Sequence, residues 1–423
     1  MTELIGIDFG TTNSVLARLD GAGRVTTSRY ALGAREFDVF RTVLCFWNEE
    51  TRDRSIRRHA AGPYAVEAYL NDPMDSRLIM SMKTYLAQHS FTRTNISGKI
   101  FTLEGMIATF LEGLTQGGQA EMQVVAGRPV RFAGEGADDD FGEQRLRAAF
   151  AQAGFASVDV ALEPEAAGYR FARTLQAPAT VLVGDFGGGT SDFSVMRFDP
   201  RGRAQVTPLG YAGVGIAGDT FDYRIIDQVV SPLLGKGDVY RVMGTALPVP
   251  PEYFSGFARW HRLSLMRAPR TLRAIEEVAA ASDHPEKLRM LIRLIEEELG
   301  YQLYQTVSAV KAELSTNESA VLRFAHAGFA VERRIERQEF ESWIAEDLRR
   351  MAAAVDQALA TAGLGHDAID RVFLTGGTSF VPAVRGIFAE RFGMDKISGG
   401  GEFVSVAEGL ALIGRDRARR PGA

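Results

Sequence analysis

The stretch around which the chain is organised spans residues 181–198 and reads VLVGDFGGGTSDFSVMRF. The apolar run Val181–Val183 and the run Phe193–Phe198 are typical of two buried strands joined by a turn. Three consecutive glycines, Gly187, Gly188 and Gly189, leave bare backbone N–H groups to line that turn. Such a nest of donors suits phosphate oxygens.

Acidic side chains flank this glycine turn. Asp185 precedes it, and Thr190 and Asp192 follow it. Two carboxylates would repel a bare phosphate, so the pattern makes sense if a divalent cation lies between them and a nucleotide. A glycine hairpin that only reverses the chain is the alternative. The aspartates on both sides favour a phosphate and metal site.

The N-terminus repeats this arrangement. A strand-like run at residues 4–7 leads into Asp8, Gly10, Thr11, Thr12 and Asn13, and a second strand-like run follows at residues 14–19. An Asp-Phe-Gly sequence opens both turns. Because the strand–turn–strand unit occurs twice, we expect two related lobes that face one ligand.

Length and composition limit the class of protein. The 423 residues suffice for two large lobes, and the net charge of −5 argues against a general nucleic-acid binder. The single cysteine, Cys45, excludes a disulfide framework and a cysteine-based metal site. No apolar run approaches the ~18 residues that span a membrane, and no signal peptide is recognisable. We therefore expect a soluble cytoplasmic protein.

Two charged residues, Lys83 and Glu163, each allow two interpretations. Lys83 lies in an otherwise apolar segment, so it is either a surface lysine or a point charge that meets a γ-phosphate. Glu163 follows a strand and precedes Pro164. It either complements a helix dipole or holds water or metal.

Two further glycine turns precede helices. Gly215, Gly218 and Asp219 lie in the first, and Gly376, Gly377 and Thr378 lie in the second. A helix N-terminus after a glycine turn is a ready anion site. A continuous amphipathic pattern predicts one long helix from about Asp283 to Leu314, with Lys311 and Ser315 near its end.

These motifs resemble those of the actin-like ATPase superfamily and, more closely, the heat-shock 70 kDa chaperone (DnaK-like) family, in particular its short YegD-like members. The resemblance covers nearly the whole chain. It rests on two phosphate motifs, a connecting motif, a glycine-acid-Phe-Asp motif and an adenosine turn, which in this sequence are residues 5–14, 184–192, 163–167, 218–222 and 373–382.

The resemblance implies an α/β fold of the actin-like (ribonuclease H-like) type, in which each of two lobes is a mixed sheet flanked by helices. The lobe boundary is expected near Ala177, giving lobes 1–177 and 178–423. Residues 231–315 are expected to form a mainly helical subdomain. The sequence ends soon after residue 413, so no peptide-binding domain is expected within it.

The resemblance also implies a site for ATP and Mg²⁺. Asp8 and Asp185 would hold the metal. The catalytic groups would be Lys83, Glu163, Thr190 and Asp192. The nucleotide-binding residues would be Gly10, Thr11, Thr12, Asn13, Gly187, Gly188, Gly189, Gly215, Gly218, Asp219, Lys311, Ser315, Gly376, Gly377, Thr378 and Phe380.

Three positions depart from the family pattern. Ala312 and Phe380 stand where the family has two arginines that sandwich the adenine, and Ser308 replaces an acid to the ribose. Phe380 could still stack on a base.

The leading prediction is a slowly hydrolysing, chaperone-like ATPase that acts on a protein client or with a co-chaperone, with no nucleic-acid or membrane partner. The alternatives are a small-molecule kinase, a non-hydrolysing nucleotide sensor and a filament-forming protein.

Overall fold

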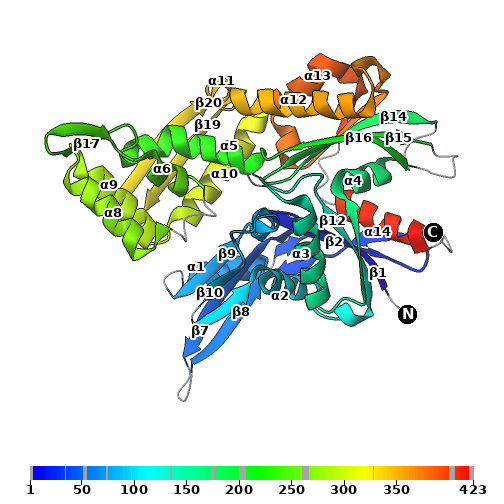
Figure 1. The fold of residues 1–423 in the computed structure, drawn as a ribbon, viewed down its shortest axis with the longest axis horizontal. Helices are drawn as coiled ribbons and strands as arrows, with labels where there is room; N and C mark the ends of the chain where they lie inside the picture. Colours follow the sequence, from blue (N-terminus) through cyan, green and yellow to red (C-terminus); the bar gives the residue numbers. More distant parts are fainter. Residues whose placement is uncertain are drawn as a thin grey trace. The chain divides into compact units, whose positions relative to one another are not determined.

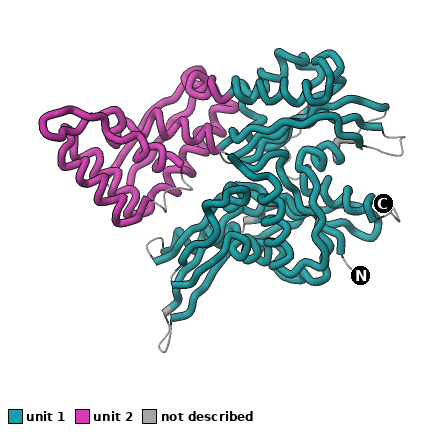
Figure 2. The backbone as a smooth tube through the Cα atoms, viewed as in Figure 1, with its two compact units in different colours: residues 1–218, 348–423 teal, residues 219–347 magenta. Residues whose placement is uncertain are grey.

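The computed structural model describes residues 3–33, 35–50, 55–72, 75–96, 98–133, 136–172, 177–199, 206–259, 266–326, 328–399 and 405–418. The chain divides into two compact units (Figure 2). The first comprises residues 1–218 and 348–423, and the second comprises residues 219–347. This division follows contacts between residues and differs from a lobe boundary near Ala177, which stays a prediction.

The first unit contains two mixed sheets of the same design. Their strand orders are β13-β12-β1-β2-β3 and β22-β21-β14-β15-β16. In each sheet a central strand pairs with the next strand as an antiparallel hairpin and with a later strand in parallel. The strands are β1 (Glu3–Phe9), β2 (Asn13–Leu19), β3 (Val25–Thr27), β12 (Met122–Arg128), β13 (Ser157–Leu162), β14 (Ala179–Phe186), β15 (Ser191–Phe198), β16 (Val206–Val214), β21 (Arg371–Thr375) and β22 (Ile397–Gly399). The repeated unit predicted from the two Asp-Phe-Gly turns is therefore present in both sheets.

Helices α2 (Leu103–Thr115) and α3 (Asp139–Gln152) pack against each other beside the first sheet (Figure 1). Apolar residues at helical spacing on α2 and α3 join alternate residues of β1, including Ile5 and Ile7, in one buried core. Thr102 caps α2 by accepting from the Gly105 N–H at 3.1 Å.

Two helices cross within the first unit, α4 (Glu163–Ala172) and α14 (Ser405–Ala418). Their apolar residues share a second core with β14 and β15. The crossing is close because Gly409 lies against Ala166: a Cβ at Gly409 would be 1.8 Å from the Ala166 carbonyl oxygen. Gly6 of β1 makes a similar approach to the backbone of α14. Glu163, the first residue of α4, is thereby positioned by this crossing.

The rest of the first unit consists of short elements that surround the first sheet, together with helices near the second. They are β4 (Tyr30–Leu32), β5 (Arg35–Phe37), β6 (Phe40–Arg41), β7 (Val43–Glu50), β8 (Ser55–Ala61), α1 (Pro63–Asn71), β9 (Ser76–Met80), η1 (Met82–Tyr85), β10 (Arg93–Ile96), β11 (Lys99–Thr102), η2 (Gln119–Glu121), η6 (His366–Ala368), η7 (Gly377–Phe380), α13 (Pro382–Phe392) and η8 (Met394–Lys396). Helix α12 (Ala345–Ala362) begins in the second unit and continues in the first.

The second unit is mainly helical and carries two hairpins. Its elements are α5 (Gly218–Ile225), which begins at the boundary residue, η3 (Ile226–Val230), η4 (Ser231–Leu234), β17 (Val239–Val242), β18 (Thr245–Pro248), α6 (Pro251–Phe257), α8 (Pro269–Ala280), α9 (Pro285–Glu296), α10 (Gly300–Thr316), β19 (Ser319–His326), β20 (Phe329–Glu336) and α11 (Arg337–Trp343). The bidentate pair between Arg224 and Asp347, with N···O distances of 2.8 and 3.1 Å, joins its two ends.

The prediction of one long helix over about 283–314 is wrong, because the segment forms α9 and α10. The chain leaves the helical conformation at Glu298, whose φ of +54° is left-handed. The apolar periodicity continues across this break, which is why the pattern alone reads as one helix.

None of the helices in the described part of the chain is both long enough and apolar enough to cross a membrane.

Candidate functional site

The two Asp-Phe-Gly turns lie beside each other in the first unit. The first connects β1 to β2, and the second connects β14 to β15. A Cβ placed on Gly189 would be 3.7 Å from the Oγ1 atom of Thr11, so residues of the two turns are adjacent. A Cβ on Gly10 would be only 2.1 Å from the Asn13 carbonyl oxygen. Only glycine therefore fits the first turn at that position.

The structure also brings Lys83 and Glu163 together. The Lys83 Nζ atom lies 2.5 Å from the Glu163 Oε1 atom, and both side chains are buried. Lys83 comes from the short helix η1, which follows Ser81 in the left-handed region with φ of +50°. Glu163 directly follows β13. Eighty residues separate the two partners, so no local pattern could reveal their contact.

Three aspartates lie close enough to this pair to respond to its charges. Burial, followed by the negative charge of Glu163, raises the pKa of Asp8 to about 7. The same two causes raise the pKa of Asp192 to about 7. Burial raises the pKa of Asp185 well above its ordinary value, and Glu163, Asp8 and Asp192 add to the effect. The negatively charged forms of these carboxyl groups are thus disfavoured at the ends of the two hairpins, and a bound cation would relieve that.

Lys83 is the cation that faces these carboxylates. Burial lowers the pKa of Lys83, but the negative charges of Glu163 and Asp8 outweigh it, and the pKa lies above the ordinary lysine value. Lys83 in turn lowers the pKa of Asp8, Asp185 and Asp192. One lysine faces four carboxyl groups, so a further cation is required before all four can carry negative charge together.

The donor set fits a hard divalent cation. Asp8 and Asp185 are partly exposed, whereas Asp192 is buried. Mg²⁺ takes oxygen ligands and is usually held by one or two carboxylates together with waters and substrate phosphates. In the described residues no group of three or more His, Cys, Asp or Glu side chains is arranged to hold a metal ion. A site built from two aspartates, water and phosphate does not require such a group.

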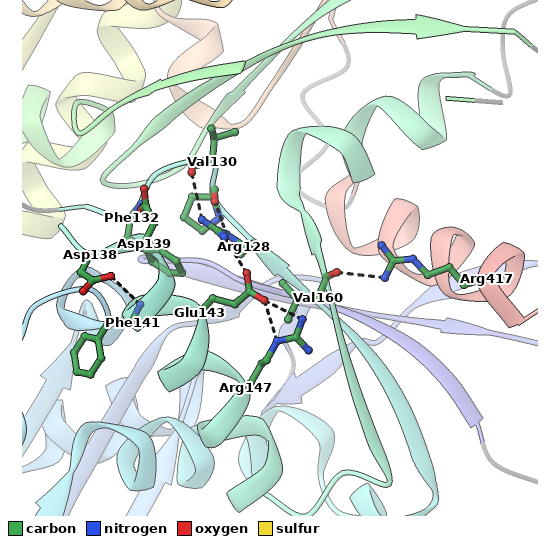
Figure 3. Close-up of polar contacts among 11 residues, drawn as sticks. Arg128, Val130, Phe132, Asp138, Asp139, Phe141, Glu143, Arg147, Val160 and Arg417 are labelled. Atoms are coloured by element: carbon green, nitrogen blue, oxygen red, sulfur yellow. Dashed lines mark hydrogen bonds and ion pairs between the residues drawn. The ribbon is translucent and has the colours of Figure 1, made fainter. Parts of the chain in front are cut away.

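Asp192 is held by a loop that the sequence did not single out. Its Oδ1 atom accepts hydrogen bonds from the backbone N–H groups of Val130 at 3.0 Å and Arg131 at 3.4 Å. Figure 3 shows how this loop is fixed: Arg128 donates to Glu143 at 2.9 Å and to the Val130 carbonyl. Backbone donors carry no residue signature, and only the Gly-Arg-Pro sequence at the end of β12 marks the turn.

The turn at 213–218 lies next to Asp192. A Cβ on Gly213 would be 2.7 Å from the Asp192 Oδ1 atom, and the Ser191 hydroxyl donates to the Ile216 carbonyl at 2.6 Å. Gly215 has open space around its Cβ position, and Gly218 begins α5. The predicted glycine turn therefore reaches the start of the second hairpin strand.

The predicted adenosine turn packs on the end of β14. Gly376 has φ of +87°, and a Cβ there would be 2.0 Å from the Phe186 carbonyl oxygen. The Ser379 hydroxyl donates to the Gly376 carbonyl at 2.6 Å. Thr378 is buried, whereas Phe380 is 46% exposed. An aromatic face is thus presented beside the glycine turns.

Asp219, Lys311 and Ser315 belong to the second unit. Lys311 donates to the Asp222 Oδ2 atom at 2.8 Å, the Ser315 hydroxyl donates to the Lys311 carbonyl at 3.2 Å, and the Tyr304 hydroxyl lies 3.3 Å from Asp219. These contacts join α5 and α10 within that unit. Ala312 is exposed on the same helix.

The paired sheets and their Asp-Phe-Gly turns define the class of the protein, which has the actin-like ATPase fold. Comparison with known proteins shows which family the chain is similar to. The family model described as "Hsp70 protein" matches residues 292–415. The chain is 27% identical over 413 residues to the chaperone protein DnaK of Deinococcus radiodurans, covering 93% of this chain and 56% of that protein. It is 25% identical over 415 residues to DnaK of Thermus thermophilus, covering 93% and 58%.

The chain is therefore similar to the heat-shock 70 kDa protein family over nearly its whole length. It spans a little more than half the length of the curated relatives that it matches.

Proposed function

We propose that this protein binds Mg²⁺ and ATP and hydrolyses the ATP slowly, as a chaperone-like ATPase whose nucleotide state controls a protein partner. The observation that carries the proposal is the Lys83–Glu163 pair, which is buried among three aspartates beside two adjacent glycine turns. Perturbed carboxylates next to a specific cation are typical of functional sites. The similarity to DnaK chaperones supports nucleotide binding.

Asp8 and Asp185 would hold Mg²⁺ through its waters. When bound, the metal ion supplies positive charge that neutralises the phosphates. The backbone of the two turns, including Thr11, Thr12 and residues 187–190, would hold the phosphate oxygens. Because the N–H groups of these turns are fixed before binding, they stabilise phosphate charge without reorganisation.

Lys83 would stabilise the charge that develops on the transferred phosphoryl group. Its ammonium is held in place by Glu163 and by the surrounding negative charge, so it is ready before a nucleotide arrives. Glu163 and Asp192 would orient the attacking water, with Thr190 beside them. Catalysis of this kind depends on positioning and electrostatics rather than on covalent chemistry.

Adenosine binding is proposed for the third turn, Gly376 to Phe380, with Gly215, Gly218, Asp219, Lys311 and Ser315 as further nucleotide contacts. The exposed ring of Phe380 could stack on the base in place of the family's arginine. Kinship with the short YegD-like members, a cytoplasmic location and a client or co-chaperone partner belong to the same proposal.

The test is Mg²⁺-dependent ATP hydrolysis by wild type, Lys83→Ala and Lys99→Ala. Lys99 is an exposed lysine of β11 and serves as the matched control. We expect slow turnover in wild type and Lys99→Ala, and loss of about 100-fold or more in Lys83→Ala. Equal turnover in all three proteins would refute the role of Lys83. Nucleotide binding without turnover in wild type would instead favour the nucleotide sensor.

A further inference from the structure

The short helix that carries Lys83 ends in backbone carbonyls that it cannot satisfy itself, as every helix does. In the segment that follows, the Gln88 N–H donates to the Tyr85 carbonyl at 3.2 Å and the Phe91 N–H donates to the Gln88 carbonyl at 3.4 Å, and Arg145 of α3 adds side-chain donors. Its Nη1 atom lies 3.0 Å from the carbonyl oxygen of Phe91, 3.2 Å from that of Tyr85, and 3.4 Å from those of Leu86 and Gln88. One guanidinium nitrogen, with two N–H bonds to share, thus lies within 3.4 Å of four carbonyls of the segment 85–91.

Arg145 is itself firmly held. Its side chain is 5% exposed, its Nε atom forms an ion pair with Glu104 of α2, and its guanidinium carbon lies 5.2 Å from the centre of the Phe141 ring. A buried guanidinium requires such partners, because leaving one uncompensated is costly. The helices α2 and α3 therefore present a fixed positive charge to the segment 85–91.

Two residues link this charge to Lys83: Tyr85, which lies in the same short helix, and Leu86. The Leu86 N–H donates to the Lys83 carbonyl at 3.2 Å, and the Leu86 carbonyl accepts from Arg145. The Lys83 side chain is 8% exposed and has little room for other rotamers. The position of its backbone therefore determines where its ammonium lies. A shift of the segment would move Nζ away from the Glu163 carboxylate.

The outer part of the segment has a weaker attachment to the same helix. The Asp138 N–H donates to the Ala87 carbonyl at 3.1 Å, and the His89 Nε2 atom lies 3.0 Å from the Asp138 Oδ2 atom. The His89 ring also stacks on Phe141 at 4.0 Å. His89 and Asp138 are exposed, so solvent competes with these contacts. Arg145 supplies the buried attachment.

We propose that Arg145 is the positioning residue for Lys83: by bonding the carbonyls of residues 85–91 it holds the short helix so that the Lys83 ammonium stays on Glu163. Arg145 does not contact the nucleotide and acts only through Lys83. The inference rests on the proposed ATPase function, in which Lys83 meets the phosphoryl group.

The experiment is a double-mutant cycle in ATP turnover with Arg145→Met, Lys83→Ala and the double variant. We expect Arg145→Met to lower kcat by about 10- to 100-fold with Lys83 present, because small misplacements of a catalytic group have effects of this size. The affinity for Mg-ATP should change less than about 3-fold. With Lys83 already removed, Arg145→Met should change kcat less than about 2-fold. An equal loss in both backgrounds would overturn the proposal.

Two further variants separate positioning from folding. Arg145→Lys keeps a buried cation that can still serve several carbonyls, so kcat should lie between those of wild type and Arg145→Met. Arg147→Met is the matched control on the same helix. Figure 3 shows Arg147 bound to Glu143, and it also donates to the Val158 carbonyl, away from the segment 85–91. Turnover of Arg147→Met should stay within about 2-fold of wild type. A loss like that of Arg145→Met would place the effect in the stability of the helix or in the Glu143–Arg128 contact of the Asp192 loop, and would overturn the proposal.

Absence of turnover in wild type would defeat the proposed function, and the inference would then be tested on Lys83 itself. The chain has six lysines, so the ¹⁵N signal of a buried, ion-paired Lys83 ammonium can be assigned by its loss in Lys83→Arg. We expect this signal in wild type and Arg147→Met, and its loss in Arg145→Met. If Arg145→Met retained the signal unchanged, Arg145 would not position Lys83.

Discussion

Replacing Gly409 by alanine tests the crossing of α4 and α14 that positions Glu163. The added Cβ would lie 1.8 Å from the Ala166 carbonyl oxygen, whereas ordinary contact begins at 3.4 Å. The two helix backbones must therefore separate, because neither atom belongs to a flexible side chain. Overpacking of this kind costs about 1–3 kcal/mol. The better helix propensity of alanine returns about 0.5–1 kcal/mol, so we expect a net loss of up to about 2.5 kcal/mol.

Gly386 provides the matched control. It also lies inside a helix, α13, but a Cβ there would meet nothing within 4 Å. Gly386→Ala should therefore stabilise the protein by about 0.5–1 kcal/mol through helix propensity alone. The same chemical change should have opposite signs at the two glycines.

Urea denaturation followed by circular dichroism measures both variants. A chain with two compact units need not unfold in a single step, so hydrogen exchange of peptides from α4 locates the effect. We expect faster exchange in α4 for Gly409→Ala and no change for Gly386→Ala. If Gly409→Ala were as stable as Gly386→Ala, the close helix crossing would be refuted.

Three further predictions follow from the site. The first concerns pH and is measured in the presence of a metal chelator: because the pKa values of Asp8 and Asp192 are raised, their contribution to the free energy of unfolding is fully present below about pH 4 and is lost as pH rises through about 7. Between pH 5 and 8, Asp192→Asn should therefore lose less stability than wild type in denaturation experiments, and identical profiles would contradict the assignment. Gly10→Ala should abolish protection by Mg-ATP against thermal unfolding, because its Cβ would clash with the Asn13 carbonyl; full protection would exclude the first turn. Phe380→Ala should weaken ATP binding by about 3- to 10-fold if the exposed ring stacks on the base, whereas an unchanged Kd in a fluorescence titration would exclude stacking.

The fold could be predicted from the sequence because its signals are local and repeated. An apolar run, an aspartate and a glycine turn occur at both hairpins, and each forms the strand–turn–strand unit that the pattern indicates. The break at Glu298 could not be predicted, because the apolar periodicity runs through it and no glycine marks the left-handed residue. Likewise, nothing in the sequence distinguishes Gly409 from Gly386, since the difference lies in a neighbouring helix.

The candidate site was only partly accessible to sequence reasoning. The residues alone left Lys83 and Glu163 with two interpretations each, and the family resemblance favoured the functional one. The structure places them 2.5 Å apart, which a separation of 80 residues hides from any local pattern. Arg145 gave no signal, because its partners are backbone carbonyls that the fold brings to it. The same holds for the N–H groups of residues 130 and 131 that bind Asp192.

The measurement that tests the central claim most directly is a calorimetric titration of ATP into wild type and Asp185→Ala, each with and without Mg²⁺. Asp185 is one of the two proposed metal ligands and lies at the end of the second hairpin. We predict that wild type binds ATP more tightly with Mg²⁺ than without it, and that Asp185→Ala loses this dependence. If Asp185→Ala bound Mg-ATP with the wild-type affinity and the same Mg²⁺ dependence, the paired aspartate turns would not be the nucleotide site.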